Sequence, residues 1–245
     1  MSIFNEYAEK SIGFIKQIQD QERDSIEKAS ELIRDVVKRD GIVYTFGTGH
    51  SHLIAEEVMY RAGGLVPVYA IIEDGITGNR EVTKSEYTER LEGYAECILN
   101  YHKPTSNDCL IIISNSGRNG VTVEMAMEAR KRGIPTVCIT SVSYSMSQSS
   151  RHKSGKRLCE LTDIVIDNCS VFGDACIQLE GLAQPVGPTS NFAATFIIHS
   201  ILVCAIDLLL KDGVEVPIFW SGNMDGGREK NEYYLEKYWH RMRCW

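Results

Sequence analysis

The feature that most constrains the fold of this chain is an unbroken apolar run, Cys-Leu-Ile-Ile-Ile, at residues 109–113. A strand that is apolar at every position must be covered on both faces, as strands are in the middle of a parallel sheet. Short apolar runs of this kind alternate with segments of helical periodicity, and we predict strands at 42–46, 65–72, 109–114, 136–140 and 161–167. Strands that alternate with helices indicate an α/β fold with a doubly wound, mostly parallel sheet.

Apolar residues spaced three or four positions apart predict the helices. We expect helix through most of the first forty residues, and further helices at 51–62, 87–101, 121–132 and 190–210. The segment at 73–88 is polar and rich in Gly, Thr and Glu, so we predict a loop there, and residues 181–190 are expected to be irregular. The last residues, 215–245, are polar with scattered aromatic side chains, which indicates an appendage.

Composition and charge disfavour several classes of protein. The chain has 245 residues with 26 basic and 33 acidic side chains, a formal net charge of −7 that disfavours a nucleic-acid or acidic-membrane partner. The most apolar stretch, 192–210, contains His199 and Asp207, so we predict a buried core helix and no membrane span. The N-terminus lacks a signal-peptide pattern, and the eight cysteines form no Cys-x-x-Cys pair. We therefore expect a cytoplasmic protein with reduced thiols.

Two glycine- and serine-rich loops follow predicted strands and precede predicted helices. The first is Gly-Thr-Gly-His-Ser at 47–51, and the second is Ser-Asn-Ser-Gly at 114–117, followed by Asn119 and Thr122. Such loops offer a phosphate backbone N–H groups, hydroxyls and the positive end of a helix. Neither loop contains the Gly-Lys-Ser/Thr of a P-loop, and His52 stands where a dinucleotide fingerprint needs glycine. The pair predicts a phosphate site at the carboxyl ends of the strands; the plainer alternative is that these residues only form turns and helix caps.

These two loops and a third segment, Gly-Pro-Thr-Ser-Asn at 187–191, resemble in order and spacing the signatures of the sugar isomerase (SIS) domain family. Within that family the chain resembles phosphoheptose-isomerase-like and uncharacterised bacterial proteins. The resemblance implies a three-layer sandwich with a five-stranded, flavodoxin-like parallel sheet. It implies one SIS domain over 1–245, with its core at about 40–210, an N-terminal helix at 5–39 and a C-terminal appendage at 215–245. It also implies a homodimer or homotetramer in which a neighbouring subunit often completes the phosphosugar site.

The resemblance also assigns roles to single residues. The residues placed to hold the phosphate are Ser51, Ser114, Ser116 and Asn119. Asn119 stands where the family usually has Ser or Thr, so Thr122 would supply the missing hydroxyl. The remaining residues expected to line the substrate site are Gly49, His50, Asn115, Thr189 and Ser190.

Isomerisation of a sugar phosphate moves a proton between adjacent carbons and needs a base, usually a carboxylate. The carboxylates near the expected site are Glu56, Glu57, Glu124, Asp174 and Glu180. The family's glutamate base aligns with Arg61, so Glu56, Glu57 or a residue of another chain must replace it. Glu57 and Arg61 are also one helical turn apart, and the alternative for Glu57 is a surface ion pair. His199 matches the position of a catalytic histidine in phosphoheptose isomerases; its alternative is a core histidine held by one hydrogen bond.

The same comparison bears on metal ions. Some phosphoheptose isomerases hold zinc, and Glu57, Asn191 and His199 align with its ligands, while Arg61 takes the place of another ligand. Because an arginine cation and an amide replace stronger ligands, we predict no metal and no cofactor.

The sequence thus leads to three functional hypotheses with one ligand class, a phosphorylated monosaccharide. The first is aldose–ketose isomerisation of a sugar phosphate, with Glu57, Glu56 and His199 as the catalytic candidates. The second is a lyase or dehydratase of an amino-sugar phosphate, which would use the same phosphate site. The third is a non-enzymatic phosphosugar-sensing module, which would act through a protein partner because no DNA-binding segment is evident.

Overall fold

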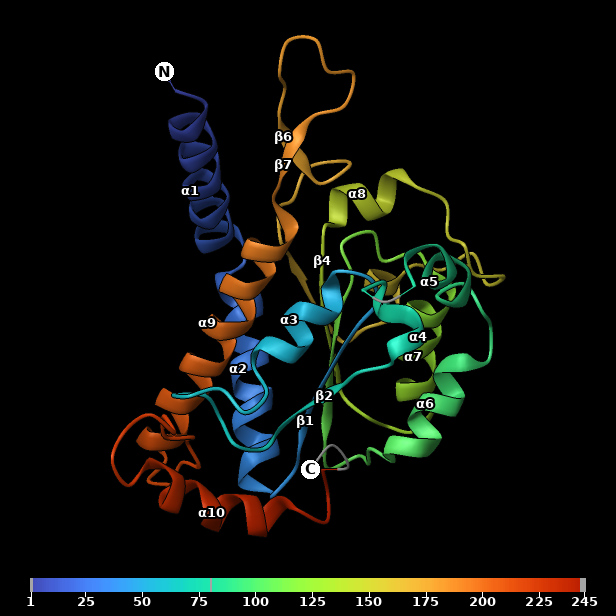
Figure 1. Ribbon diagram of the computed structural model, residues 1–245. Helices are drawn as coiled ribbons and strands as arrows, with labels where there is room; N and C mark the ends of the chain where they lie inside the picture. Colours follow the sequence, from blue (N-terminus) through green and yellow to red (C-terminus); the bar gives the residue numbers. More distant parts are fainter. Residues whose placement is uncertain (1, 80, 243–245) are drawn as a thin grey trace.

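Five strands form one parallel sheet in the order β2-β1-β3-β4-β5 (Figure 1). The computed structural model describes residues 2–79 and 81–242. The strands are β1 (Val43–Gly47), β2 (Val68–Ile71), β3 (Cys109–Ile113), β4 (Thr136–Thr140) and β5 (Ile164–Asp167). The chain passes outward from β1 to β2 and then crosses back to β3, so the strand order reverses between β1 and β3, as in flavodoxin-like sheets. The predicted five-stranded parallel sheet is confirmed.

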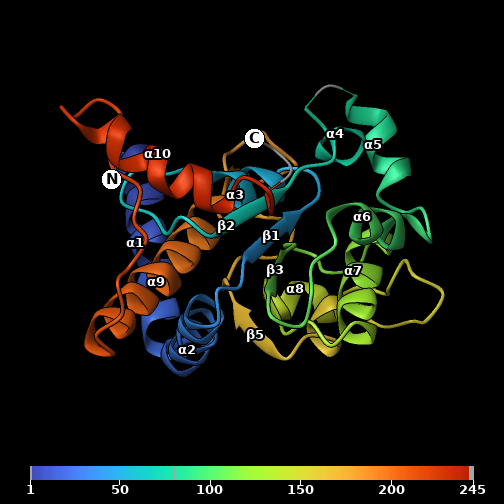
Figure 2. The same cartoon turned by 90° about the horizontal axis from the view of Figure 1, so that it is seen from below.

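Helices cover both faces of this sheet and make three layers (Figure 2). One face carries α2 (Arg23–Lys38), α3 (Ser51–Glu57) and α9 (Ser190–Lys211), and the other carries α6 (Tyr94–His102) and α7 (Gly120–Lys131). The apolar run of β3 divides between two cores: Cys109, Ile111 and Ile113 pack on the α2 and α9 side, and Leu110 and Ile112 pack on the α6 and α7 side. Every position of β3 is apolar because both of its faces are buried.

The N-terminal segment forms two helices, where we predicted one. Helix α1 (Ile3–Gln21) ends because Glu22 leaves helical geometry, with φ −109° and ψ 10°, and α2 begins at the next residue. Helix α2 buries its apolar face in the core, whereas α1 leaves Phe4 79% exposed and contacts the β6–β7 hairpin, where the Tyr7 hydroxyl donates to the Pro188 carbonyl at 2.7 Å. The apolar spacing continues across the break, so the pattern alone could not reveal it.

Other helix boundaries correct the predictions. Helix α3 stops at Glu57, five residues early, and Tyr60 beyond it has φ +53°, which a right-handed helix cannot contain. Helix α6 begins at Tyr94 and not at 87, because its N-cap Gly93 has φ +84°, a left-handed conformation that glycine adopts without strain. The predicted loop at 73–88 contains α4 (Asp74–Thr77) and α5 (Val82–Thr88). These two helices bury few side chains, so apolar spacing gave no signal for them.

The segment at 181–190, expected to be irregular, contains a strand: β7 (Val186–Pro188) forms a hairpin with β6 (Ala175–Ile177) before α9. The sequence analysis also gave no helix for α8 (Val142–Ser147) or the 3-10 turn (Leu158–Glu160) between β4 and β5. The C-terminal appendage contains α10 (Gly227–Tyr238) and packs on its own domain. Ile218 pairs with Leu65, and Phe219 and Tyr238 are each 2% exposed in the core.

Helix α9 is the most apolar element of the chain. Its length and composition alone would allow it to cross a membrane, and 44% of its most apolar window is buried inside the protein. Those buried residues pack against α2 and the sheet, which is the arrangement we predicted for a core helix. The cysteines among the described residues are free thiols; Cys244 lies outside the described residues.

Candidate functional site

The two predicted phosphate loops leave neighbouring strands at the same edge of the sheet. Gly47 at the end of β1 pairs with Ile113 at the end of β3, so the loops at 48–50 and 114–119 begin side by side. This is the point where the strand order reverses, which is where ligands bind in open α/β sheets.

The first loop is a tight turn in which two backbone N–H groups already donate hydrogen bonds within the protein. A Cβ on Gly47 would lie 2.5 Å from the Ser51 carbonyl oxygen, so only glycine allows the turn. The N–H of Gly49 donates to Ile76, and the N–H of Ser51 donates to Thr48. His52 is 4% exposed, and its Nδ1 lies 2.5 Å from the Gly49 carbonyl oxygen, whereas His50 faces solvent. The first loop therefore offers a ligand the side chains of His50 and Ser51.

The second loop is fixed by hydrogen bonds to two of its own side chains. The Gly117 N–H donates to Ser114 Oγ at 3.1 Å, and Asn168 Nδ2 donates to Asn115 Oδ1 at 3.0 Å. Gly117 has φ +57°, and a Cβ there would lie 3.0 Å from Ser145 Oγ. Ser116 is half-buried between these fixed residues. Ser114 and Asn115 thus shape the loop, which leaves Ser116 as the loop serine without a structural hydrogen bond among the described residues.

The N-terminus of α7 contains an unsatisfied hydroxyl. Thr122, in the first turn, is 0% exposed, and its Oγ1 has no hydrogen-bond partner within residues 2–79 and 81–242. The N–H groups of Val121 and Val123 donate to the carbonyls of Glu89 and Asn119. Side chains in a helix lean toward its N-terminus, so the Thr122 side chain leans toward the start of α7. A buried hydroxyl without a partner is costly unless a ligand or water satisfies it.

Glu89 joins the two loops, and no motif in the sequence pointed to it. Its Oε2 accepts a hydrogen bond from Thr48 Oγ1 at 3.0 Å, its carboxylate also bonds the Asn119 side chain, and its carbonyl accepts from Val121. Burial raises the pKa of the Glu89 carboxyl above its usual value, against the opposing effect of those hydrogen bonds and of Arg151 and Arg90. It lies just after α5 and belongs to no motif, so only the three-dimensional structure places it in the site.

Three arginines surround the same helix end. Arg151 Nη1 donates to Asn119 Oδ1 at 2.9 Å, and Arg118 Nη1 donates to Gln148 Oε1 at 3.0 Å. Burial and the nearby charges of Arg118 and Arg90 lower the pKa of Arg151. Among the described residues none of these arginines has a carboxylate within 4.0 Å. The cluster has positive charge to offer an anion.

At the start of α9, Thr189 and Ser190 already donate hydrogen bonds to a carboxylate of the same chain. Asp174 Oδ1 accepts the N–H groups of Thr189 at 3.0 Å and Ser190 at 2.7 Å, and Asp174 Oδ2 accepts the Ser190 hydroxyl at 2.8 Å. Both residues are almost fully buried. The structure therefore shows their hydroxyls bound to Asp174.

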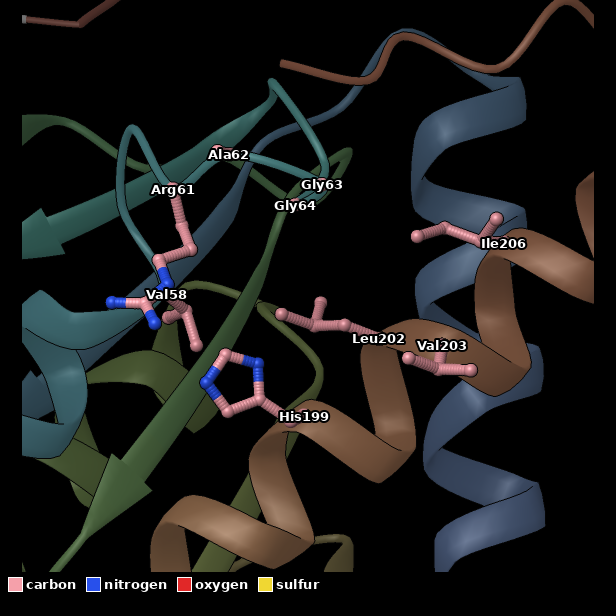
Figure 3. Close-up of a pocket in the computed structure, with 9 residues that line it drawn as sticks. All are labelled: Val58, Arg61, Ala62, Gly63, Gly64, His199, Leu202, Val203 and Ile206. Atoms are coloured by element: carbon pink, nitrogen blue, oxygen red, sulfur yellow. The ribbon is translucent and has the colours of Figure 1, made fainter. Parts of the chain in front are cut away.

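The catalytic candidates of the sequence gather elsewhere, between α3 and α9. Glu57 Oε1 lies 2.7 Å from Arg61 Nη1 and 3.7 Å from His199 Nε2; the expected ion pair is present, although α3 ends at Glu57 and Arg61 lies beyond the helix. Figure 3 shows His199 reaching from α9 toward Arg61, beside a cavity of about 80 Å³. No residue of either phosphate loop lines this cavity, and it is small beside the ~300 Å³ at the lower end of ligand pockets. Glu56 is exposed on α3.

One further cluster has the composition of a metal site. Among the described residues, donor atoms within 4.8 Å of one another come from Glu92, Glu124 and His152. Glu124 Oε2 accepts the Gly93 N–H at 2.6 Å, and His152 Nδ1 accepts the Ser154 N–H at 3.2 Å. Because Nδ1 accepts, the neutral ring carries its proton on Nε2, the atom that faces Glu124 at 3.5 Å. The protonated Nε2 thus faces the carboxylates of Glu124 and Glu92, and the cluster brings the loop after α8 next to α7.

The chain is similar to known proteins over nearly its whole length. A family model described as SIS domain matches residues 6–141, which include both loops. The UPF0309 protein of Geobacillus thermodenitrificans (strain NG80-2) is 40% identical over 240 residues, which are 98% of this chain and 96% of the relative.

Solved structures share the fold at low identity. Phosphoheptose isomerase GmhA from Neisseria gonorrhoeae matches with a TM-score of 0.57 and 15% identity over 82% of this chain and 96% of that chain. A phosphoheptose isomerase from Francisella tularensis matches at 0.53 and 16% identity, over 82% and 95% of the two chains. The Vibrio vulnificus NanR protein complexed with ManNAc-6P matches at 0.50 and 16% identity, over 99% and 70%. At these identities the similarity is one of fold.

Proposed function

Because the chain belongs to the SIS domain family, we propose that it binds a phosphorylated monosaccharide and isomerises it between its aldose and ketose forms. The phosphate binds at the N-terminus of α7, between the loop at 114–119 and the first loop. Neighbours in fold that are phosphoheptose isomerases, and one that is a complex with ManNAc-6P, support a sugar phosphate as the ligand.

The observation that carries this proposal is the unsatisfied end of α7. The Thr122 hydroxyl is buried without a partner among the described residues, three arginines with no described carboxylate within 4.0 Å lie near the N-terminus of α7, and the helix adds its own positive end. A phosphate dianion supplies both the hydrogen-bond acceptors and the charge that this region lacks. Ser116 and Ser51 then contact the phosphate or the sugar from the two loops.

The proposal includes a second copy of the chain, which would complete the site. His199 and Glu57 lie on α9 and α3, away from the phosphate loops, and α9 also exposes apolar side chains to solvent, with Val203 near His199 at 64% and Leu210 farther along at 62% exposed. An exposed apolar surface of this kind favours association of subunits. We propose a cytoplasmic homodimer or homotetramer of single SIS domains, in which His199 serves the phosphate site of a neighbouring subunit.

A ligand screen tests the proposal. The melting temperature is measured with pentose, hexose, heptose and N-acetylhexosamine phosphates and with the same sugars without phosphate, because a ligand of the native state raises it. We expect a rise with one or more phosphorylated sugars and none with the unphosphorylated forms. Ser116→Ala should reduce the rise, whereas Ser106→Ala, an exposed serine in the turn before β3 at the opposite edge, should not. Folded protein that responds to no sugar phosphate would contradict the proposed function.

The same screen separates isomerisation from the alternatives. Hits are incubated with the enzyme and analysed for ketose or aldose products, for elimination products of amino-sugar phosphates, and for no change. Elimination would favour a lyase or dehydratase, and binding without any conversion would favour a sensing module.

A further inference from the structure

The proposed isomerisation needs a base, and most carboxylates near the carboxyl edge of the sheet already have partners. Glu57 is paired with Arg61 at 2.7 Å. Asp174 holds the first turn of α9 through hydrogen bonds to two N–H groups and to hydroxyls. Glu124 faces His152 and accepts the Gly93 N–H. A base engaged in this way would have to break structural contacts in each cycle.

Glu89 is held differently, because its partners come from both phosphate loops. Thr48 Oγ1 donates to it from the first loop at 3.0 Å, and the Asn119 side chain bonds it from the N-cap of α7. Its main chain is fixed on the same helix, through the Val121 N–H, and a Cβ on Gly120 would lie 2.9 Å from the Arg90 carbonyl oxygen. A ligand that contacts both loops must therefore lie next to this carboxylate.

Opposing influences act on the charge of Glu89. Burial favours the protonated form, while Thr48, Asn119, Arg151 and Arg90 favour the carboxylate. With Arg118, the arginines carry three positive charges, which equal the charges of one phosphate dianion and one ionised Glu89. A bound phosphate would thus compensate the arginines, weaken their hold on the carboxylate and make Glu89 a stronger base.

We propose that Glu89 is the acid–base residue that moves the proton between the two carbons of the sugar phosphate, an assignment that rests on the proposed function. In the aldose, the Glu89 carboxylate takes the proton from C2. The C2–H electron pair forms the C1=C2 bond of an enediolate, and the π pair of the C1 carbonyl moves to O1. Protonated Glu89 returns the proton to C1 while the O2 hydroxyl gives its proton to O1, which leaves a ketone at C2 and a carboxylate on Glu89.

The test follows proton exchange, which is independent of the isomerisation equilibrium. Each aldose phosphate that stabilises the wild-type protein is incubated in D₂O, and loss of the C2 proton signal is followed by ¹H NMR. Glu89→Gln should slow the exchange by about 10²- to 10⁴-fold, the range of general acid–base catalysis, with a dissociation constant within about fivefold of wild type. Glu89→Asp, which keeps the carboxylate on a shorter side chain, should restore part of the rate, whereas a structural role would give equal effects in both variants.

Control variants separate the possible outcomes. Glu86→Gln, an exposed carboxylate on α5, should leave the exchange rate at the wild-type level, and Glu57→Gln tests the competing candidate for the base. Unchanged exchange in folded Glu89→Gln would overturn the assignment, and loss of exchange in Glu57→Gln alone would give the role to Glu57. A wild-type protein that binds sugar phosphates without exchanging any C2 proton overturns the base while leaving the phosphate site standing. A wild-type protein that binds no sugar phosphate removes the proposed function itself.

Discussion

Helices α7 and α9 both begin near the carboxyl edge of the sheet, and they differ in how the positive charge of their first turn is neutralised. At α9 the chain provides its own anion, since Asp174 accepts the N–H groups of Thr189 and Ser190 at 3.0 and 2.7 Å. At α7 the N-cap Asn119 makes no capping hydrogen bond, and Thr122 keeps a buried hydroxyl without a partner among the described residues. Similar serine- and threonine-rich motifs at helix starts thus differ: the motif at α9 is satisfied within the chain, and the motif at α7 is the one that we propose binds a ligand.

The largest effect that we expect is on the stability of the protein, and it comes from substitutions of Asp174 at the start of α9. Asp174→Ala removes the acceptor of several buried donors, and we expect a loss of about 3 kcal/mol in the free energy of unfolding. Asp174→Asn, which suits the left-handed φ of +68° at this position, should lose only about 1 kcal/mol from the missing charge. Chemical denaturation measures both, with the exposed Asp225→Ala as control. Equal stability of Asp174→Ala and wild type would remove the contrast.

A substitution at the start of α7 should change the free energy of unfolding in the opposite direction. Thr122→Val keeps the shape of the side chain and removes the unsatisfied hydroxyl, so we expect the ligand-free protein to gain up to about 1 kcal/mol in stability. The affinity for a sugar phosphate should fall about tenfold, the equivalent of ~1.4 kcal/mol, because the hydroxyl can no longer donate. Denaturation without ligand and calorimetric titration with it measure the two effects. A loss of stability in the absence of ligand would show that Thr122 has a structural partner.

The arginines around α7 provide a further test of the contrast. Arg151→Gln removes one positive charge near Asn119 and should weaken phosphate binding by about fivefold, an effect of ~1 kcal/mol at a partly exposed site. Calorimetric titration at two salt concentrations should show a weaker salt dependence in the variant. Arg228→Gln, on exposed α10, serves as control. Equal affinity of Arg151→Gln and wild type would exclude Arg151 from the anion site.

The weakest of these effects is the pH dependence of stability. The pKa of Glu89 is raised in the folded protein above its ordinary value of 4.5, so folding favours its protonated form. Stability from this residue is present at pH below 4.5 and declines as pH rises through the raised pKa. The difference in unfolding free energy between wild type and Glu89→Gln should therefore move against wild type as pH increases from about 4 upward. A difference that is constant with pH would mean that the pKa of Glu89 is not raised.

The sheet could be predicted from the sequence because its strands are buried on both faces, so each appears as a short apolar run. The helices that pack on the core were predicted by their apolar spacing, within a few residues at their ends. The segment from 73 to 93 was misassigned, because α4 and α5 bury few side chains and Gly93 sets the start of α6 by its backbone conformation. Local physical signals of this kind leave little trace in hydrophobic periodicity.

The candidate site shows a similar division. The positions of the two loops followed from the motif and its place after a strand, but which side chains remain available did not. Thr189 and Ser190 look in the sequence like ligand residues, and in the structure Asp174 holds them. Glu89 and Arg151 come from segments outside every motif, and they meet at Asn119 only because the connections after β2 and after α8 fold over the same helix end.

Among its described residues, the connection between β2 and α6 contributes no strand to the sheet, and backbone hydrogen bonds link it to the first loop at Gly49 and to α7 at Val121. Its exposed residues can therefore change without altering the strands, provided that Ile76 in the core and Glu89 with its contact to Val121 are kept. Relatives with the same scaffold could acquire different sugar preferences by substitution within this one connection. It also marks the stretch to randomise when the protein is evolved in the laboratory toward a new substrate.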